Sequence, residues 1–203
     1  MASNVAQIPS ITFDAERHLY RVDGREVPSV TQCLRAAGLI DTTWFTDLGR
    51  WRGSAVHLAC QLDDEGDLDE GDLDPRIVPH LAAYRDFKRD YTFIPDEIEQ
   101  ARYNATFGYV GTPDRVGRVM LGTNECPAIV DLKVGGSVPA YALQLAGYAN
   151  LLPEPRKHLR LKVWLGPGRY NVHQYSPATF GADLNVFLSA VAITQWKRKE
   201  NVA

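Results

Sequence analysis

The order of strand-like and helical segments between residues 98 and 175 constrains the fold of this chain more than any other feature. Three strand-like segments come first, and Gly135-Gly136 breaks the third of them. A helical stretch follows from Ala140 to Leu152, and Pro139 suits its first turn. Strands on both sides of a crossover helix predict an α/β fold, a central mixed β-sheet flanked by helices. The predicted strands are Ile98–Tyr103, Tyr109–Val116, Ala128–Lys133, Leu159–Leu165 and Arg169–Tyr175.

The first 95 residues are predicted to form an N-terminal β-hairpin and a helical part. Ile11 to Pro28 is strand-like on both sides of the turn signal Asp23-Gly24. Pro113 lacks the amide hydrogen of a ladder bond, so we expect a bend there. Without a repeat or a clear linker, residues 1–203 are expected to form one domain with its core in residues 96–203. The first predicted helix begins after Pro28-Ser29 and ends at Gly38. The other predicted helices are Leu48–Leu62, Pro75–Asp90, the crossover helix and a C-terminal helix from Pro177.

Composition favours a cytoplasmic protein with no membrane partner. A hydrophobic fraction of 45% and a charged fraction of 23% are ordinary for globular chains. No apolar run reaches the roughly 18 residues of a membrane helix, and the N-terminus lacks the pattern of a signal peptide. Cys33, Cys60 and Cys126 form no CxxC pair and are too few for a disulfide framework.

The net charge of −3 hides an uneven distribution. Residues 63–74 hold eight acids and no base, so the rest of the chain has 17 acids against 22 bases, a net charge of +5. The acidic stretch is typical of a solvated, mobile loop. The remainder predicts a basic surface that a polyanion could bind.

Two carboxylates and a lysine lie at the ends of two adjacent predicted strands. Asp114 belongs to Gly111-Thr-Pro-Asp-Arg115, and Asp131-Leu-Lys133 ends the next strand. Carboxylates hold hard cations such as Mg²⁺, which can activate water and stabilise charge on a phosphate. A lysine can orient that water or stabilise the same phosphate. The pattern therefore indicates metal-assisted phosphodiester chemistry, although Asp-x-Lys by itself is more often a solvated strand end.

Other polar residues fall near this pair in the predicted layout. Glu99 lies on the preceding strand, and Gln144 and Tyr148 share one face of the crossover helix. His57 lies in Arg52-Gly-Ser-Ala-Val-His57, where the imidazole could bind a metal and Arg52 a phosphate. Taken singly, each is more often a surface or structural residue than a functional one.

Taken in order, these motifs resemble the RecB branch of the PD-(D/E)XK nuclease superfamily. The resemblance covers about residues 50–150 and rests on Arg-Gly-x-x-x-His, Glu, Gly-x-x-Asp, Asp-x-Lys and Gln-x-x-x-Tyr. That branch includes RecB-type nuclease domains, CRISPR-associated adaptation nucleases and small phage exonucleases. His18-Leu-Tyr and Val27-Pro-Ser-Val also resemble the opening of the phage-encoded members.

The resemblance implies a restriction-endonuclease-like core and a role for each motif residue. Asp114, Asp131 and the carbonyl of Leu132 would bind one or two Mg²⁺ or Mn²⁺ ions, with His57 as a further ligand or a phosphate contact. Lys133 would position water or stabilise the phosphate, and Glu99 would assist a second metal or the outer shell. The residues expected to contact DNA are Arg52, Arg115, Gln144 and Tyr148, with the basic stretch 156–162, Trp44 and Trp51 as further candidates.

The resemblance implies a DNA exonuclease of phage or prokaryotic recombination, repair or degradation. No cysteine follows Cys126, so no iron–sulfur cluster is expected, and without a Gly-x-x-x-x-Gly-Lys-Ser/Thr loop no use of ATP is expected. Two alternatives stay open: a structure-specific endonuclease or resolvase with the same metal chemistry, and a non-catalytic DNA-binding subunit. A recombination or single-strand annealing protein is a candidate partner, and an oligomer is compatible with the sequence.

Overall fold

A computed structural model describes residues 9–41, 46–136 and 138–202. Its N-terminal part is a three-stranded antiparallel meander in the order β1-β2-β3. The predicted hairpin is therefore confirmed, with the residues after Asp23-Gly24 forming the third strand. The meander consists of β1 (Ile11–Asp14), β2 (Leu19–Val22) and β3 (Arg25–Val27).

The main sheet has five strands in the order β10-β9-β8-β7-β4. β8 and β9 are parallel, because the helix α4 (Tyr141–Ala149) carries the chain across between them, and all other neighbours are antiparallel. The prediction of a mixed sheet with a crossover helix is confirmed. Its strands are β4 (Ile94–Ile98), β7 (Arg115–Leu121), β8 (Asn124–Lys133), β9 (Leu159–Gly166) and β10 (Arg169–Tyr175).

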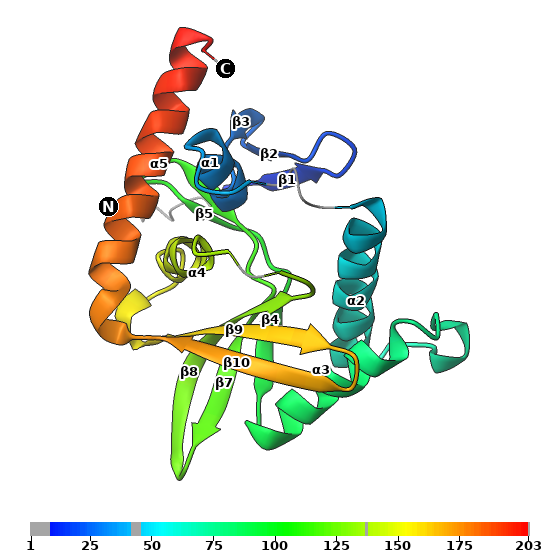
Figure 1. The fold of residues 1–203 in the computed structure, drawn as a ribbon. Helices are drawn as coiled ribbons and strands as arrows, with labels where there is room; N and C mark the ends of the chain where they lie inside the picture. Colours follow the sequence, from blue (N-terminus) through cyan, green and yellow to red (C-terminus); the bar gives the residue numbers. More distant parts are fainter. Residues whose placement is uncertain (1–8, 42–45, 137, 203) are drawn as a thin grey trace, which may run out of the picture.

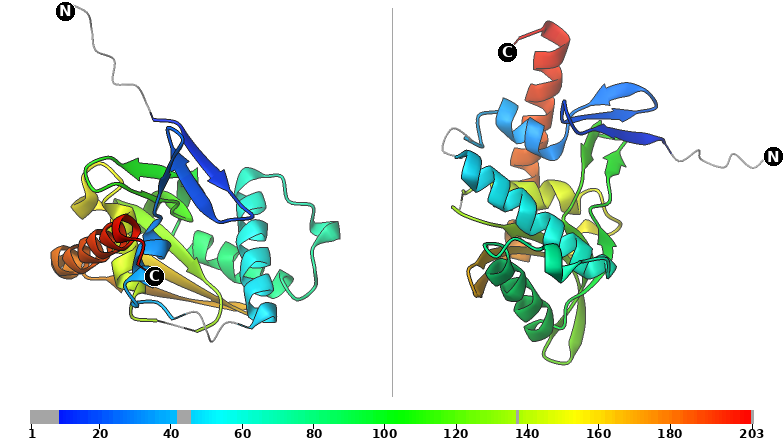
Figure 2. Two further views of the ribbon diagram at one scale, coloured as in Figure 1. Left: turned by 90° about the horizontal axis from the view of Figure 1, so that it is seen from above. Right: turned by 90° about the vertical axis from the view of Figure 1, so that its right-hand side faces the viewer.

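Helices cover both faces of this sheet (Figure 1). Strand residues alternate between the two faces, so Val130 and Leu132 of β8 pack with α2 and α3, whereas Ile129 packs with α1, α4 and α5. Figure 2 shows the same layers from two further sides. The structure is thus α/β, as the sequence predicted. The other α-helices in the described residues are α1 (Val30–Ala36), α2 (Asp47–Glu65), α3 (Val78–Asp90) and α5 (Phe180–Glu200).

Two predicted strands are divided in the structure. The predicted strand Ile98–Tyr103 is interrupted after β4, where Glu99 has a left-handed backbone with φ 47°. The predicted strand Tyr109–Val116 is interrupted at Pro113, where a bend was expected. The separated pieces, β5 (Arg102–Asn104) and β6 (Tyr109–Gly111), pair as a two-stranded sheet of their own. Glu99 and Asp114 therefore lie in irregular backbone at strand ends.

The prediction of a mobile loop over residues 63–74 is wrong for its first three residues. Asp63, Asp64 and Glu65 form the last turn of α2, which Gly66 ends in a left-handed conformation with φ 77°. The structure also contains three 3₁₀ turns, η1 (Glu70–Asp72), η2 (Pro155–Lys157) and η3 (Pro177–Thr179). The acidic stretch is therefore partly ordered helix, and one of its carboxylates reaches the functional site.

Among the described residues, one helix is long and apolar enough to cross a membrane by length and composition, Pro177–Glu200. Its Phe187, Ala190 and Val191 are buried in the core cluster with α1 and α4. A core helix can meet the same length and composition test, so one such helix is weak evidence of a membrane span.

Candidate metal centre

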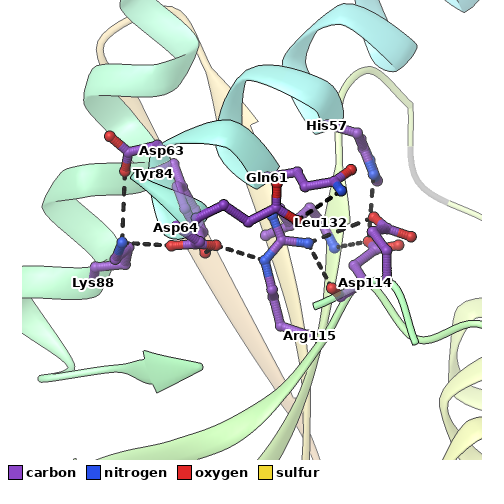
Figure 3. A network of polar contacts seen from close by, with 11 residues as sticks. His57, Gln61, Asp63, Asp64, Tyr84, Lys88, Asp114, Arg115 and Leu132 are labelled. Atoms are coloured by element: carbon purple, nitrogen blue, oxygen red, sulfur yellow. Dashed lines mark hydrogen bonds and ion pairs between the residues drawn. The ribbon is translucent and has the colours of Figure 1, made fainter. Parts of the chain in front are cut away.

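One face of α2 supplies the polar side chains that point toward the ends of β7 and β8. His57, Gln61 and Asp64 are spaced i, i+4 and i+7, which places them on the same side of a helix (Figure 3). Thr46 caps the start of α2 by accepting a hydrogen bond from the amide of Gly49 at 3.1 Å. A capped helix packed on the sheet thus holds His57 and Asp64 at fixed positions.

Three potential metal ligands meet at this point. One ligand atom from each of His57, Glu99 and Asp114 lies within 4.8 Å of the other two. Nδ1 of His57 is 3.7 Å from Oδ2 of Asp114. The same Oδ2 accepts a hydrogen bond of 2.6 Å from the amide of Leu132, and the amide of Glu99 donates to the carbonyl of Asp114 at 3.1 Å. Backbone hydrogen bonds from two neighbouring segments therefore fix the position of Asp114.

The ionisation of these groups suits a cation. Burial lowers the pKa of His57, which keeps the imidazole neutral and its lone pair free to bind a metal. Burial and the nearby Asp114 raise the pKa of Glu99 to about 8. A carboxyl group stays protonated near neutral pH when the positive charge around it is too small to stabilise the carboxylate. A divalent ion supplies such a charge. The mixed nitrogen and oxygen donors thus fit a divalent metal without identifying which one.

Asp131 and Lys133 lie beside the three ligands as an ion pair. Nζ of Lys133 is 2.7 Å from Oδ2 of Asp131, whose residue is 1% exposed. Burial raises the pKa of Asp131 to about 7, with Lys133 opposing the shift and Asp114 adding to it. Burial alone would lower the pKa of Lys133, but the carboxylates of Asp131 and Asp114 raise it. Asp131 is close enough to interact with Asp114, although it is not one of the three converging ligands.

Leu132 contributes through its backbone. Its amide binds Asp114, and a hydrogen bond from His57 to the Leu132 backbone partly offsets the lowered pKa of the imidazole. The predicted role of the Leu132 carbonyl as a metal ligand stays a prediction. In the structure, the Leu132 backbone contacts two of the three candidate ligands, Asp114 and His57.

The predicted pair on the crossover helix lies next to the ion pair. Nε2 of Gln144 is 3.2 Å from the hydroxyl of Tyr148, and both residues are buried. Burial and the carboxylates of Asp131 and Asp114 raise the pKa of Tyr148, so its hydroxyl stays protonated as a possible donor. The aromatic ring of Tyr141 lies 4.9 Å from Nζ of Lys133. α4 therefore forms the wall of the site around Lys133.

Gly111 allows this helix to approach. A Cβ at Gly111 would lie 2.5 Å from Cδ1 of Leu151 and 2.9 Å from Cδ1 of Tyr148, which is closer than real contacts allow. The absence of a side chain at Gly111 therefore leaves room for the side chains of Leu151 and Tyr148.

A buried ionic network lies behind the ligands (Figure 3). Nε of Arg115 is 2.6 Å from Oδ2 of Asp64, and neither side chain is exposed. Nη1 of Arg115 donates to the carbonyl of Asp114 at 2.5 Å and lies 3.5 Å from the carboxylate of Glu99. Asp64 also accepts hydrogen bonds from Tyr84 and Lys88 of α3. The network ties α2 and α3 to the segments that carry two of the metal ligands.

The prediction that Arg115 contacts DNA is wrong, because its side chain is fully buried in this network. Asp64 and Tyr84 were missed as site-supporting residues. Asp64 follows His57 by seven positions, so the helical spacing contained the signal. The acid-rich composition around Asp64 led to the prediction of a solvated loop instead.

Other predicted DNA contacts have neighbours outside the group of candidate ligands. Arg52 is near His80 of α3, whose pKa is lowered mainly by burial and further by the charge of Arg52. The guanidinium of Arg76 stacks 4.2 Å over the ring of Trp51, which is 39% exposed, and Trp44 lies outside the described residues. The contact of Arg52 with DNA stays a prediction.

The basic stretch 156–162 is not a free cationic surface. Arg160 is buried, and its Nη1 is 2.8 Å from Oδ2 of Asp183 in α5. Nζ of Lys157 is 2.6 Å from Oε1 of Glu154. The expectation that the whole stretch contacts phosphate is therefore wrong for Arg160, which holds α5 against β9.

We expect Mn²⁺ to raise the melting temperature of the protein more at pH 8.5 than at pH 5.5. The pKa of Glu99 rises on folding from 4.5 to about 8, so the stability tied to its proton is complete below pH 4.5 and is lost as the pH rises through about 8. A bound cation stabilises the ionised form, so its effect grows over this range. Thermal unfolding with and without Mn²⁺ measures the difference. Glu99→Gln should flatten the pH dependence, and an equal shift at both pH values in the native protein would contradict the prediction.

Comparisons with known proteins add little to this geometry. No protein-family model matches the chain, and no curated protein matches it. Among solved structures, the chain is similar to the crystal structure of SSO0001, with 13% identity, coverage of 79% of this chain and 83% of that chain, and a TM-score of 0.31. A likeness at this TM-score carries no argument about family or activity.

Proposed function

We propose that this protein is a divalent-metal-dependent deoxyribonuclease with a PD-(D/E)XK-type core, acting as an exonuclease. The observation that carries the proposal is the convergence of His57, Glu99 and Asp114 beside the Asp131–Lys133 ion pair. Metal-ligating donors next to a buried lysine are groups that can catalyse metal-assisted phosphodiester hydrolysis. The order of motifs that resembles the RecB branch supports the same assignment.

His57, Glu99 and Asp114 are the residues that would hold the cation, with Asp131 close by. A bound Mg²⁺ or Mn²⁺ would polarise the phosphate and lower the pKa of a coordinated water. The neutral imidazole of His57 and the fixed carboxylate of Asp114 supply donors without rearrangement of the backbone. Preformed donors reduce the reorganisation needed when the site binds its ligand.

Lys133 supplies the positive charge of the site. Its ammonium stays protonated because Asp131 and Asp114 raise its pKa, so it acts as a charge that orients water or stabilises the phosphate and not as a proton acceptor. Asp131 holds the ammonium in place, and the ring of Tyr141 covers it from α4. Gln144 and Tyr148 add neutral donors on the same wall.

The fold supports this assignment at the level of architecture. In the described residues, Asp114 precedes β7 and Asp131-Leu-Lys133 ends β8, so these two adjacent antiparallel strands bring them to the same end of the mixed sheet. Helices on both faces cover that end, with His57 on the helix of one face and Tyr148 on the helix of the other. A cytoplasmic location, expected from composition, and a recombination partner, expected from the family resemblance, stay predictions.

The direct test is degradation of end-labelled linear DNA by purified protein. We expect shortening of the linear molecule with Mg²⁺ or Mn²⁺ and none with EDTA, while covalently closed circular DNA stays intact. The circle and a linear form of the same plasmid are a matched pair, because they differ only in having ends. Nicking of the circle as fast as the linear form is shortened would replace the exonuclease assignment with an endonuclease. Absence of cleavage with any divalent metal would overturn the proposed function.

A further inference from the structure

A cleft of about 470 Å³ joins Glu99, one of the three candidate metal ligands, to the N-terminal meander. Its lining includes the ligand Glu99 and, from the meander, the aromatic side chains of Phe13, His18 and Tyr20. The volume lies in the range of sites that bind small organic groups and is far below that of a duplex segment. One candidate ligand and an aromatic surface therefore share this cleft.

The three rings of the meander form a cluster, named here the aromatic platform. Phe13 and Tyr20 face each other across β1 and β2, with ring centroids 4.6 Å apart, and the ring of His18 meets Phe13 edge-on at 5.2 Å. Phe13 is 46% exposed although its ring is large and apolar. An exposed aromatic ring beside a cleft offers its face to another planar group.

The aromatic platform is held in a fixed relation to the metal ligands. The hydroxyl of Tyr20 is 2.8 Å from Oγ1 of Thr112, two residues before Asp114. His18 has a left-handed backbone with φ 54°, and Nε2 of Gln32 in α1 donates to its carbonyl at 2.8 Å. A strained residue held by a neighbouring helix indicates a loop with a defined position. The platform is thus organised before any ligand binds.

We propose that the aromatic platform binds an unpaired base at the end of a DNA strand whose adjacent phosphate lies at the metal centre. This inference rests on the proposed nuclease function and names its substrate class. In a duplex both faces of each internal base are covered by its neighbours, so only a terminal or displaced base offers a free face, and the small volume of the cleft favours a single unpaired base. Stacking on aromatic side chains is tolerant of sequence, as degradation from an end requires.

The test uses single-stranded DNA of ten nucleotides that carries 2-aminopurine at either end. It is mixed with the Lys133→Ala protein and Ca²⁺, and the DNA is checked to stay intact. We expect the terminal 2-aminopurine to lose fluorescence on binding. Phe13→Ala should abolish this quenching and weaken binding about tenfold, within the range of single-base stacking contributions. Phe13→Trp should retain both properties, because it keeps a stacking face.

Phe107→Ala is the matched control, since Phe107 is 39% exposed and does not line the cleft. Equal quenching and affinity in Phe13→Ala and its parent would overturn the stacking subsite, as would an equal loss in Phe107→Ala. A protein that stacks strand ends but cuts no DNA would overturn the proposed function and keep the subsite. A protein that cuts DNA, but whose binding and quenching do not change in Phe13→Ala, would overturn the subsite and keep the proposed function.

Discussion

Replacing Lys133 with alanine is expected to lower the rate of metal-dependent DNA cleavage by about 10²–10³-fold, the usual effect of removing one group that stabilises charge in a transition state. Nζ of Lys133 is 2.7 Å from Asp131, and its ammonium stays charged at neutral pH. The loss should fall on kcat, because this charge is needed most when the phosphate gains negative charge. Single-turnover cleavage of labelled linear DNA measures it.

The fold should survive this change. Without Lys133, Asp131 can take up a proton, since its pKa is already about 7 in the folded protein. Lys199→Ala is the matched control, because Lys199 is an exposed lysine beside Glu200 at the end of α5 and should keep full activity. Cleavage by Lys133→Ala at the native rate, in protein free of contaminating nuclease, would exclude Lys133 from the chemistry.

Replacing Asp64 with asparagine is expected to lower the free energy of unfolding by about 3–5 kcal/mol, the typical cost of removing one partner from a buried ion pair. The Asp64 side chain is fully buried and accepts hydrogen bonds from Arg115, Tyr84 and Lys88. The amide of asparagine keeps the volume but leaves the buried guanidinium of Arg115 without its nearest counter-charge. Denaturant unfolding followed by circular dichroism measures the change.

Asp86→Asn is the control for Asp64→Asn. Asp86 forms an exposed pair with Arg89 one turn along α3, and such pairs contribute about 0–1 kcal/mol. Metal affinity should also fall in Asp64→Asn, because Arg115 holds the carbonyl of Asp114 and contacts Glu99. A destabilisation no larger than that of Asp86→Asn would show that the network does not support the fold.

Much of the architecture was predictable from local patterns. Turn residues and strand alternation located the meander, the hairpin of β9 and β10 and the break at Pro113. The crossover helix followed from Gly135-Gly136 and Pro139. The prediction was wrong where local composition and tertiary context disagreed. Asp63 and Asp64 of the acid-rich stretch lie in the helix, where Arg85, Lys88 and Arg115 compensate their charge and Tyr84 donates a hydrogen bond to Asp64.

The candidate site was also predicted only in part, because segments distant in sequence decide which of its side chains meet. The sequence motifs supplied most of the candidate site residues, and the structure brings together His57, Glu99 and Asp114. It also shows Arg115 inside the protein, although an arginine beside a predicted catalytic aspartate suggests a phosphate contact. Whether a cation faces solvent or a buried carboxylate depends on segments distant in sequence, which local pattern does not record.

The sequence by itself determined the order of strands and helices and the identity of the candidate ligands, because turn propensities and side-chain periodicity act over a few residues. Only the tertiary structure decided which ligands meet, that Asp131 pairs with Lys133, and that Phe13, His18 and Tyr20 share a cleft with Glu99. Those relations arise when β7, β8, α2 and the meander pack together. Burial and neighbouring charges then shift the pKa of each group, as for Glu99, whose pKa burial and Asp114 raise.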